Sequence, residues 1–264
     1  MIRLLKLEIH KNFSYPAFWV ILGLHYFFLV TVLFNIQDLA GSLNISDSDY
    51  GNMDLSLVPI LQFPDIWHNI TYIASFFKIL LGIFIVINIT NEFQFNTIRL
   101  NLTNGLSRVE FISSKILLII IISIVSLAVV FAGGLVLGLK NHEGTGTIQM
   151  LDQSIYLIGY FLEILIYLVL ALFIGIWLKR TGISIVALLI YPLLIEPIIR
   201  WQFPDTIDRF FPVNAMDELI VFPFPKYFGI EIPEGISPLM IGVVIAWIII
   251  FYLLSIFILK KKSL

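Results

Sequence analysis

Residues 111–139 read FISSKILLIIIISIVSLAVVFAGGLVLGL, an apolar run in which Lys115 is the single charged residue. As an α-helix this run would extend roughly 42 Å, whereas the hydrocarbon core of a bilayer is about 30 Å thick. It therefore predicts a transmembrane helix that tilts or protrudes. Gly134 and Gly138 lie four residues apart, a spacing that permits close helix packing. We expect this packing to occur within the chain, with a dimer contact as the alternative.

The whole chain has the composition of an integral membrane protein. Its 264 residues are 59% hydrophobic and 13% charged, with a mean hydropathy of +0.98. Soluble domains usually carry about 25% charged residues. There is no cysteine, which excludes a disulfide framework and any cysteine-ligated metal site. Apolar runs recur throughout, so we interpret residues 1–264 as a single transmembrane domain.

Six segments satisfy the requirement of about 20 mostly apolar residues for a spanning helix. They are residues 17–35, 70–90, 111–139, 154–178, 183–200 and 237–259. Near the span ends, eleven lysines and arginines fall on one side and four on the other. Because the basic side faces the cytoplasm, both termini are predicted to be cytoplasmic. The fold class is then all-α and multi-pass, in the cytoplasmic (inner) membrane of a prokaryote.

Two further segments are predicted to lie at the membrane surfaces. Residues 1–16 are basic and amphipathic, so they favour a helix in the inner interface beside anionic lipids. The alternative is a basic flank that only sets the topology. Residues 201–236 combine five prolines with many aromatic residues, a mixture typical of short broken helices at the outer interface.

The polar stretch NEFQFNTIRLNLTNGLSR, residues 91–108, separates the second and third predicted spans. Phe95, Ile98 and Leu102 recur at spacings of three and four, which predicts the apolar face of a short helix lying across the spans. A helix of this kind either docks in a groove of a partner or rests on the membrane surface. The residues alone leave both interpretations open.

The end of this stretch carries two helix signals. Gly105 can adopt the left-handed conformation that ends a helix. Ser107 and Glu110 then form the pattern of a capping box, in which each side chain accepts from the backbone amide of the other residue. The box directly precedes the apolar run, so it predicts the start of the third span.

These residues resemble the first cytoplasmic loop of ABC-2 type permeases, the membrane subunits of type V exporters of the ATP-binding-cassette class. The arrangement of the whole chain is similar as well, from the amphipathic N-terminal helix to the proline-rich segment before the last span. In the 91–108 loop and the start of the next span, the resemblance rests on Glu92, Thr97, Arg99, Gly105, Ser107, Arg108, Phe111 and Lys115. Asn96 departs from the small residue expected before the threonine.

The resemblance implies that this loop holds a coupling helix that docks in a groove of a separate ATPase subunit. Phe95, Ile98 and Leu102 would be its apolar anchors, while Arg99 and Arg108 would pair with acids or helix ends on the ATPase. Glu92 would orient the loop at the membrane boundary. The predicted ATPase-coupling set is Glu92, Phe95, Thr97, Ile98, Arg99, Leu102, Ser107 and Arg108.

The resemblance also implies the partners. They are two ATPase subunits, a second permease chain in a homodimer or heterodimer, and membrane lipids. The chain has no G-x-x-x-x-G-K-[ST] motif, so ATP and Mg²⁺ would be bound by the ATPase. No serine lies in a nucleophile-elbow pattern, and the four histidines are scattered. We therefore expect no catalytic residue, metal, cofactor or nucleic acid in this chain.

Three ionisable residues lie well within predicted spans, away from their ends, namely Lys78, Glu163 and Glu196. Charges within a bilayer are costly, so they usually pair or serve a function. Lys78 and Glu163 lie at similar depths, about 12 and 14 Å from the outer ends of their helices at 1.5 Å per residue. We predict that Lys78 pairs with Glu163, or alternatively with Glu196. The pair would be a structural clamp or a polar lining of an export path.

The sequence thus favours a permease subunit of an ATP-driven exporter. Its substrate would be amphipathic, lipid-like or a peptide, because the spans are rich in phenylalanine. The alternative is a secondary transporter or channel without an ATPase partner. A secondary transporter would be marked by a repeated pair of broken helices, and only the fifth predicted span, with Pro192 and Pro197, has the sequence of a broken one.

Overall fold

The computed structural model describes residues 2–42, 45–47, 51–53, 60–103, 105–141 and 150–261. Within this part, β1 (Ile45–Asp47) and β2 (Gly51–Met53) form a small antiparallel hairpin. The remaining elements are helical: α1 (Ile2–Phe13), α2 (Pro16–Ser42), α3 (Ile66–Ser75), α4 (Lys78–Gln94), α5 (Thr97–Thr103), α6 (Arg108–Asn141), α7 (Ile155–Leu178), α8 (Thr181–Ile190), η2 (Tyr191–Ile195), α9 (Glu196–Arg200), α10 (Asp205–Asp208), α11 (Pro212–Asp217), η3 (Phe224–Phe228) and α12 (Pro238–Lys261).

Five helical segments are long and apolar enough to cross a membrane. They are Pro16–Ile36, Arg108–Asn141, Ile155–Leu178, Thr181–Arg200 and Pro238–Lys261. Helices α3 and α4 pass the same test together but are bent by 41° at a short break, so they make a sixth segment if the pair counts as one span. The described part of the chain is therefore mainly helical, with the long apolar helices of an all-α membrane protein. Each predicted segment coincides with one of these helices or with the bent pair.

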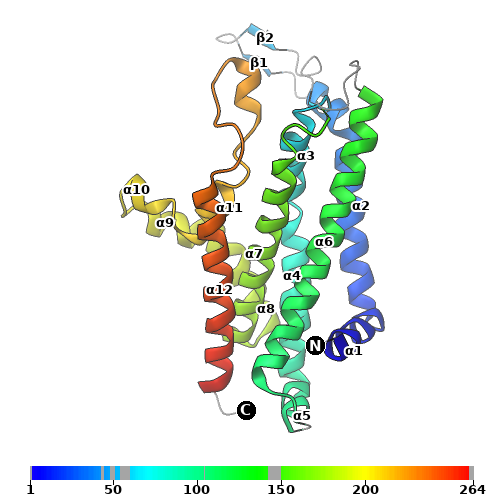
Figure 1. Cartoon of the computed structure of the whole chain (residues 1–264), viewed down its shortest axis with the longest axis vertical. Coiled ribbons are helices and arrows are strands. Elements are labelled where there is room, and N and C mark those ends of the chain that lie inside the picture. Colours follow the sequence, from blue (N-terminus) through cyan, green and yellow to red (C-terminus); the bar gives the residue numbers. More distant parts are fainter. Residues whose placement is uncertain are drawn as a thin grey trace.

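Helix α7 forms the centre of the bundle, with α4, α6 and α12 around it (Figure 1). In its most apolar 18-residue window, 78% of the residues are buried, against 17–33% in the other four segments. This follows from its composition, because α7 is apolar on all sides and contains a single charged residue, Glu163. A helix that is hydrophobic all round is stable only when other helices or lipid surround it.

The two glycines of the long span pack within the chain, as predicted. A methyl group added at Gly134 would lie 2.5 Å from Ile70 Cδ1 and 2.7 Å from Trp67 Cζ3. One added at Gly138 would overlap the Phe63 ring. Helix α6 can approach α3 this closely only because both positions lack a side chain.

Proline disrupts the fifth predicted span, as expected. Proline has no backbone N–H and its ring clashes with the preceding turn. Pro192 lies in the π-helical turn η2, and Pro197 lies in the short helix α9 that follows. Residues 201–236 then form the short helices α10, α11 and η3, which confirms the prediction of broken helices there.

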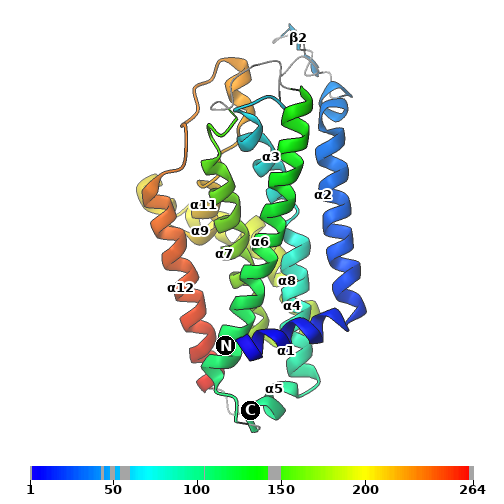
Figure 2. The same ribbon diagram turned by 45° about the vertical axis from the view of Figure 1, so that its right-hand side comes forward.

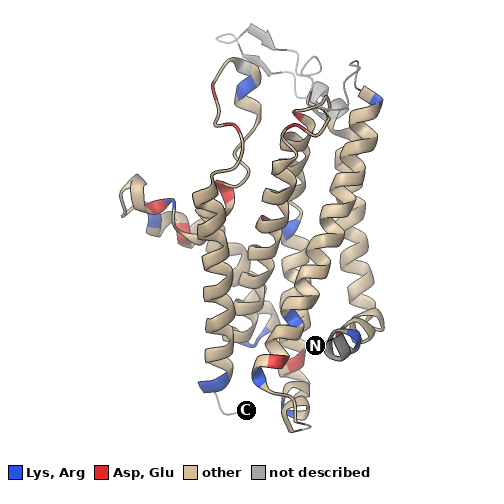
Figure 3. Cartoon of the chain, in the orientation of Figure 1, with Lys and Arg blue, Asp and Glu red and all other residues tan. Residues whose placement is uncertain are grey.

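Helix α1 and the last turn of α12 lie at the same end of the bundle as α5 (Figure 1). Helix α1 lies across the bundle at this end, as the predicted interfacial helix should (Figure 2). Lysines and arginines of α1, of the turn around α5 and of the end of α12 gather here (Figure 3). The short helix η3 lies at the opposite end.

Candidate functional site

The 91–108 loop folds into a turn, a short helix and a second turn. The first turn contains Asn96 with φ 55°, in the left-handed region that asparagine tolerates better than most residues. Helix α5 follows, and the amide of Gly105, with φ 93°, donates to the carbonyl of Leu102 at 3.1 Å. The predicted sequence of span, turn, short helix and span is therefore confirmed. Asn96 is also the residue that departs from the permease pattern.

The capping box is present at the start of α6. The amide of Ser107 donates to Glu110 Oε2 at 2.9 Å, and the amide of Glu110 donates to Ser107 Oγ at 3.2 Å. Two amides at the helix start, which have no partner within the helix, are thereby satisfied. The loop consequently joins α6 in one defined orientation.

Replacing Ser107 with alanine should lower the free energy of unfolding by about 1 kcal/mol, within the 0.5–2 kcal/mol typical of lost helix caps. Detergent-solubilised protein unfolded by titration with sodium dodecyl sulfate would report the change. Thr206→Ala is a suitable control because Thr206 is exposed and outside the loop. Equal stabilities of the two variants would show that the cap contributes nothing.

A buried polar cluster roots the loop in the bundle. Glu92, 1% exposed, accepts hydrogen bonds from both Lys11 and Lys115. Lys115 Nζ also donates to Glu8 Oε2 at 2.7 Å and to Asn88 Oδ1 at 3.0 Å. These contacts join α1, α4 and α6 at one point. We name Glu8, Lys11, Asn12, Asn88, Glu92 and Lys115 the root cluster, in which Asn88 also donates to Asn12.

One residue of the predicted coupling set, Glu92, belongs to this cluster, and a second, Thr97, borders it. Thr97 Oγ1 lies 3.3 Å from the Glu92 carbonyl and 3.4 Å from Glu92 Oε2, so it ties the first turn of α5 to the root cluster. Glu92 thus contacts the loop that it was predicted to orient. The sequence did not point to Glu8, Lys11 or Lys115 as partners in this cluster, since they lie in two other predicted helices, residues 1–16 and 111–139.

The predicted apolar face of Phe95, Ile98 and Leu102 does not form one exposed surface, because two of these residues pack against the core. Ile98 is 1% exposed and packs in the core, so it cannot anchor a partner, and Leu102 is half-buried against the same core. Phe95 and Leu100 are instead 70% and 60% exposed. The left-handed Asn96 explains the difference, because it separates Phe95 from the periodicity of the helix that follows. Within the helix, Leu100 lies about 200° from Ile98 at 100° per residue.

The two arginines of the predicted set differ in their surroundings. Arg99 is exposed on α5. Arg108 is half-buried and lines a shallow pocket with Leu106 and Lys260 of α12. Its Nε is buried and makes no hydrogen bond to a described residue. Arg99 is therefore accessible to a partner beside Phe95 and Leu100, and Arg108 lies at the edge of the loop.

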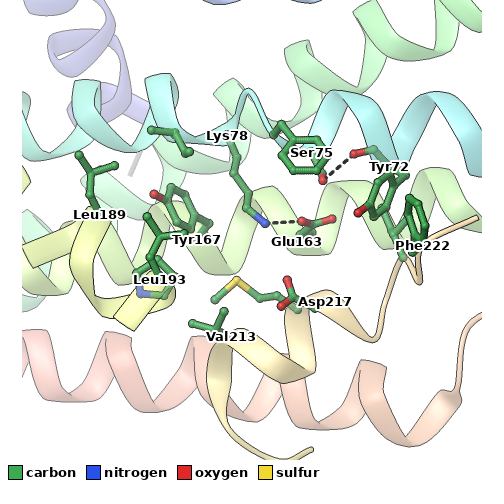
Figure 4. Close-up of a pocket in the computed structure, with 15 residues that line it drawn as sticks. Tyr72, Ser75, Lys78, Glu163, Tyr167, Leu189, Leu193, Val213, Asp217 and Phe222 are labelled. Atoms are coloured by element: carbon green, nitrogen blue, oxygen red, sulfur yellow. Dashed lines mark hydrogen bonds and ion pairs between the residues drawn. The ribbon is translucent and has the colours of Figure 1, made fainter. Parts of the chain in front are cut away.

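The second cluster of predicted residues lies at the break between α3 and α4. Lys78, the first residue of α4, forms an ion pair with Glu163 of α7 (Figure 4). Their side chains are 17% and 4% exposed. This is the pairing that equal depth predicted. The two residues line a cavity of about 430 Å³, which we name the charged pocket, together with Tyr72, Ser75, Tyr167, Leu193, Val213 and Asp217.

Glu196 is not part of this pocket, so the alternative pairing with Lys78 is wrong. Its buried carboxylate accepts from the backbone amides of Val213 at 2.7 Å and Asn214 at 3.0 Å. Both amides belong to the first turn of α11, where helix amides lack partners within the helix. Glu196 thereby holds α11 against the apolar segment that η2 interrupts, and this explains an acid inside that segment.

Asp217 is the pocket residue that the sequence did not identify. It ends α11 and lies outside every predicted span. The fold instead brings it to the pocket beside Lys78 and Glu163 (Figure 4). Removal from bulk water raises the pKa of its carboxyl group, while the charges of Lys78 and Arg200 oppose this shift.

Comparison with known proteins places the chain in a family without assigning it an activity. No curated protein is significantly similar to it in sequence. One family model, described as "Protein of unknown function (DUF2705)", matches residues 27–264. The match covers all the elements from within α2 to the end of α12, including the 91–108 loop and the charged pocket. The chain therefore belongs to the DUF2705 family.

Proposed function

We propose that this protein is the permease subunit of an ATP-driven exporter, powered by a separate ATPase. It works as a dimer of six-span chains with cytoplasmic termini in the inner membrane of a prokaryote. The ATPase subunits bind ATP and Mg²⁺, and the permease moves an amphipathic, lipid-like or peptide substrate outward. The observation that carries this proposal is the short helix α5, which sits at the end of the bundle and is firmly rooted in it (Figure 1).

The surface of α5 fits a docking helix. Phe95 and Leu100 are exposed at the end of the bundle where the basic residues gather, and Arg99 lies between them in sequence. Aromatic and arginine side chains are the residues that most often dominate protein interfaces. A helix that only rested on a lipid surface would gain little from the buried ionic contacts at its root.

The root cluster and the capping box make α5 a rigid extension of the bundle. Movement of α5 by the ATPase would pass to α4 and α6, which flank it, and to α1 through Glu92 and Lys11. Helix α4 has 17 residues, or roughly 25 Å at 1.5 Å per residue. One end carries α5 and the other carries Lys78 in the charged pocket. A single helix thus connects the proposed ATPase contact with the proposed substrate path.

Co-purification in detergent with the ATPase encoded beside its gene tests this proposal. The wild-type chain should capture that ATPase. Replacing both Phe95 and Leu100 with serine should reduce the capture at least tenfold, because the two exposed apolar anchors are lost. Ile98 is left unchanged, since its burial means that substitution would damage the fold itself.

The matched control replaces Leu151 and Ile230 with serine. These residues are 61% and 60% exposed and lie outside the 91–108 loop. This control should capture the ATPase as well as the wild type does. The proposal is wrong if the wild type captures no ATPase, or if the Phe95 and Leu100 variant captures as much as the control.

A secondary transporter is the second candidate, and one observation favours it. Two broken segments line the charged pocket, the bent α3–α4 pair and the segment interrupted by η2. Broken helices at a central polar site are typical of secondary transporters. Substrate uptake by proteoliposomes that hold this chain alone, driven by an ion gradient, would favour this candidate over the exporter.

A further inference from the structure

The charged pocket is lined by more acidic than basic side chains. Lys78 supplies one positive group, whereas Glu163 and Asp217 supply two carboxylates. The ammonium of Lys78 is bound to Glu163. Asp217 forms no hydrogen bond or ion pair with any residue in the described part of the chain, and its side chain is accessible from the pocket. The nearest further cation, Arg200, is paired with Asp208.

Two buried polar atoms of pocket residues also lack partners. The Ser75 hydroxyl lies near Glu163 but donates to the Tyr72 carbonyl at 2.8 Å, which leaves the second oxygen of Glu163, Oε2, without a hydrogen bond to the described residues. The hydroxyl of Tyr167 likewise makes no hydrogen bond to them. Glu163 and Tyr167 are almost fully buried residues, at 3% and 2% exposed. Buried polar groups are nearly always hydrogen-bonded, so each such exception needs an explanation. A ligand cation in the pocket would pair with Asp217, which is exposed there, and would add a positive charge near the buried Glu163 carboxylate.

The rest of the pocket is apolar and aromatic. Its walls include Tyr72, Phe222, Leu193 and Met216. A volume of about 430 Å³ is within the range of small-molecule sites, which are mostly apolar with a few polar groups that fix the orientation of the ligand. The charge, the unpartnered acceptors and the apolar walls together describe one kind of occupant.

We propose that the charged pocket binds a primary ammonium group attached to an apolar body. The ammonium donates to Asp217, beside the Lys78–Glu163 pair, and the apolar part lies against Tyr72 and Leu193. A carboxylate or phosphate ligand would instead face two carboxylates and is excluded by repulsion. The binding itself needs no ATPase. The further identification of this amphiphilic amine as the exported substrate class rests on the function proposed above.

Binding of radiolabelled 4-phenylbutylamine to the full chain in lipid nanodiscs tests the proposal, with empty nanodiscs subtracted as background. We expect saturable binding that unlabelled 4-phenylbutylamine displaces at least tenfold better than 4-phenylbutanol or 4-phenylbutanoate does. Asp217→Asn, which keeps the shape of the side chain, should weaken binding at least tenfold. Asp152→Asn, an exposed acid outside the pocket, is the matched control and should leave binding unchanged.

Three results would overturn the proposal. They are the absence of saturable binding, equal displacement by the amine and the carboxylate, and equal binding by the Asp217→Asn and Asp152→Asn variants. Because the assay contains no ATPase, its failure leaves the exporter proposal standing. If the chain captures no ATPase, the exporter proposal is wrong, but the proposed amine site still stands.

Discussion

Replacing Lys115 with methionine should destabilise the folded chain by about 3–5 kcal/mol, the cost of breaking a buried ion pair from one side. Lys115 is 2% exposed and contacts both Glu8 and Glu92. Its removal leaves Glu92 buried with Lys11 as its remaining cation. The free energy of unfolding, measured by titration with sodium dodecyl sulfate, would report the loss.

A second variant shows whether charge is the cause. Lys115→Met combined with Glu92→Gln should recover part of the stability, because the uncompensated carboxylate is gone and the coupling between adjacent sites is non-additive. Lys140→Met is the control, since Lys140 is exposed at the end of α6. It should change stability by no more than about 0.5 kcal/mol. If Lys115→Met resembled this control, the root cluster would contribute nothing to the fold.

Lys78→Met should have a comparable effect at the charged pocket. It leaves Glu163 at the centre of the bundle without its cation, and we expect a loss of about 3–5 kcal/mol for the same reason. Melting of the purified protein, followed by tryptophan fluorescence, would detect it. A Lys78→Met variant that was as stable as the wild type and transported normally would contradict both proposed roles of the Lys78–Glu163 pair, the structural clamp and the lining of an export path.

The double variant Lys78→Met with Glu163→Met separates these two roles. Replacing a buried ion pair by apolar residues of similar size is often neutral or stabilising, so the double variant should regain the stability lost by Lys78→Met. If the pair is only a clamp, this folded protein should bind 4-phenylbutylamine as the wild type does. If the pair lines the substrate path, binding should fall at least tenfold although the fold is intact.

Local properties of the sequence determined most of the fold. The predicted apolar segments match, within a few residues, the five helices that are long and apolar enough to cross a membrane and the bent α3–α4 pair, because the length of a hydrophobic run is read directly from consecutive side chains. The capping box at Ser107, the end of α5 at Gly105 and the disruption around Pro192 are equally local, since each depends on a residue and its near neighbours. The Lys78–Glu163 pair was also predictable, because depth follows from helix rise and few charges lie inside the membrane.

Only the tertiary structure decided which side chains gather and which remain accessible. Lys115 and Glu8 are 107 residues apart in the chain, and Asp217 reaches the pocket from an outer segment that carries no periodic signal. Phe95 was wrongly grouped with Ile98 and Leu102 on one face, because the left-handed residue Asn96 separates Phe95 from the helix after it. Periodicity describes positions along one helix, whereas contacts between helices depend on how their whole surfaces pack.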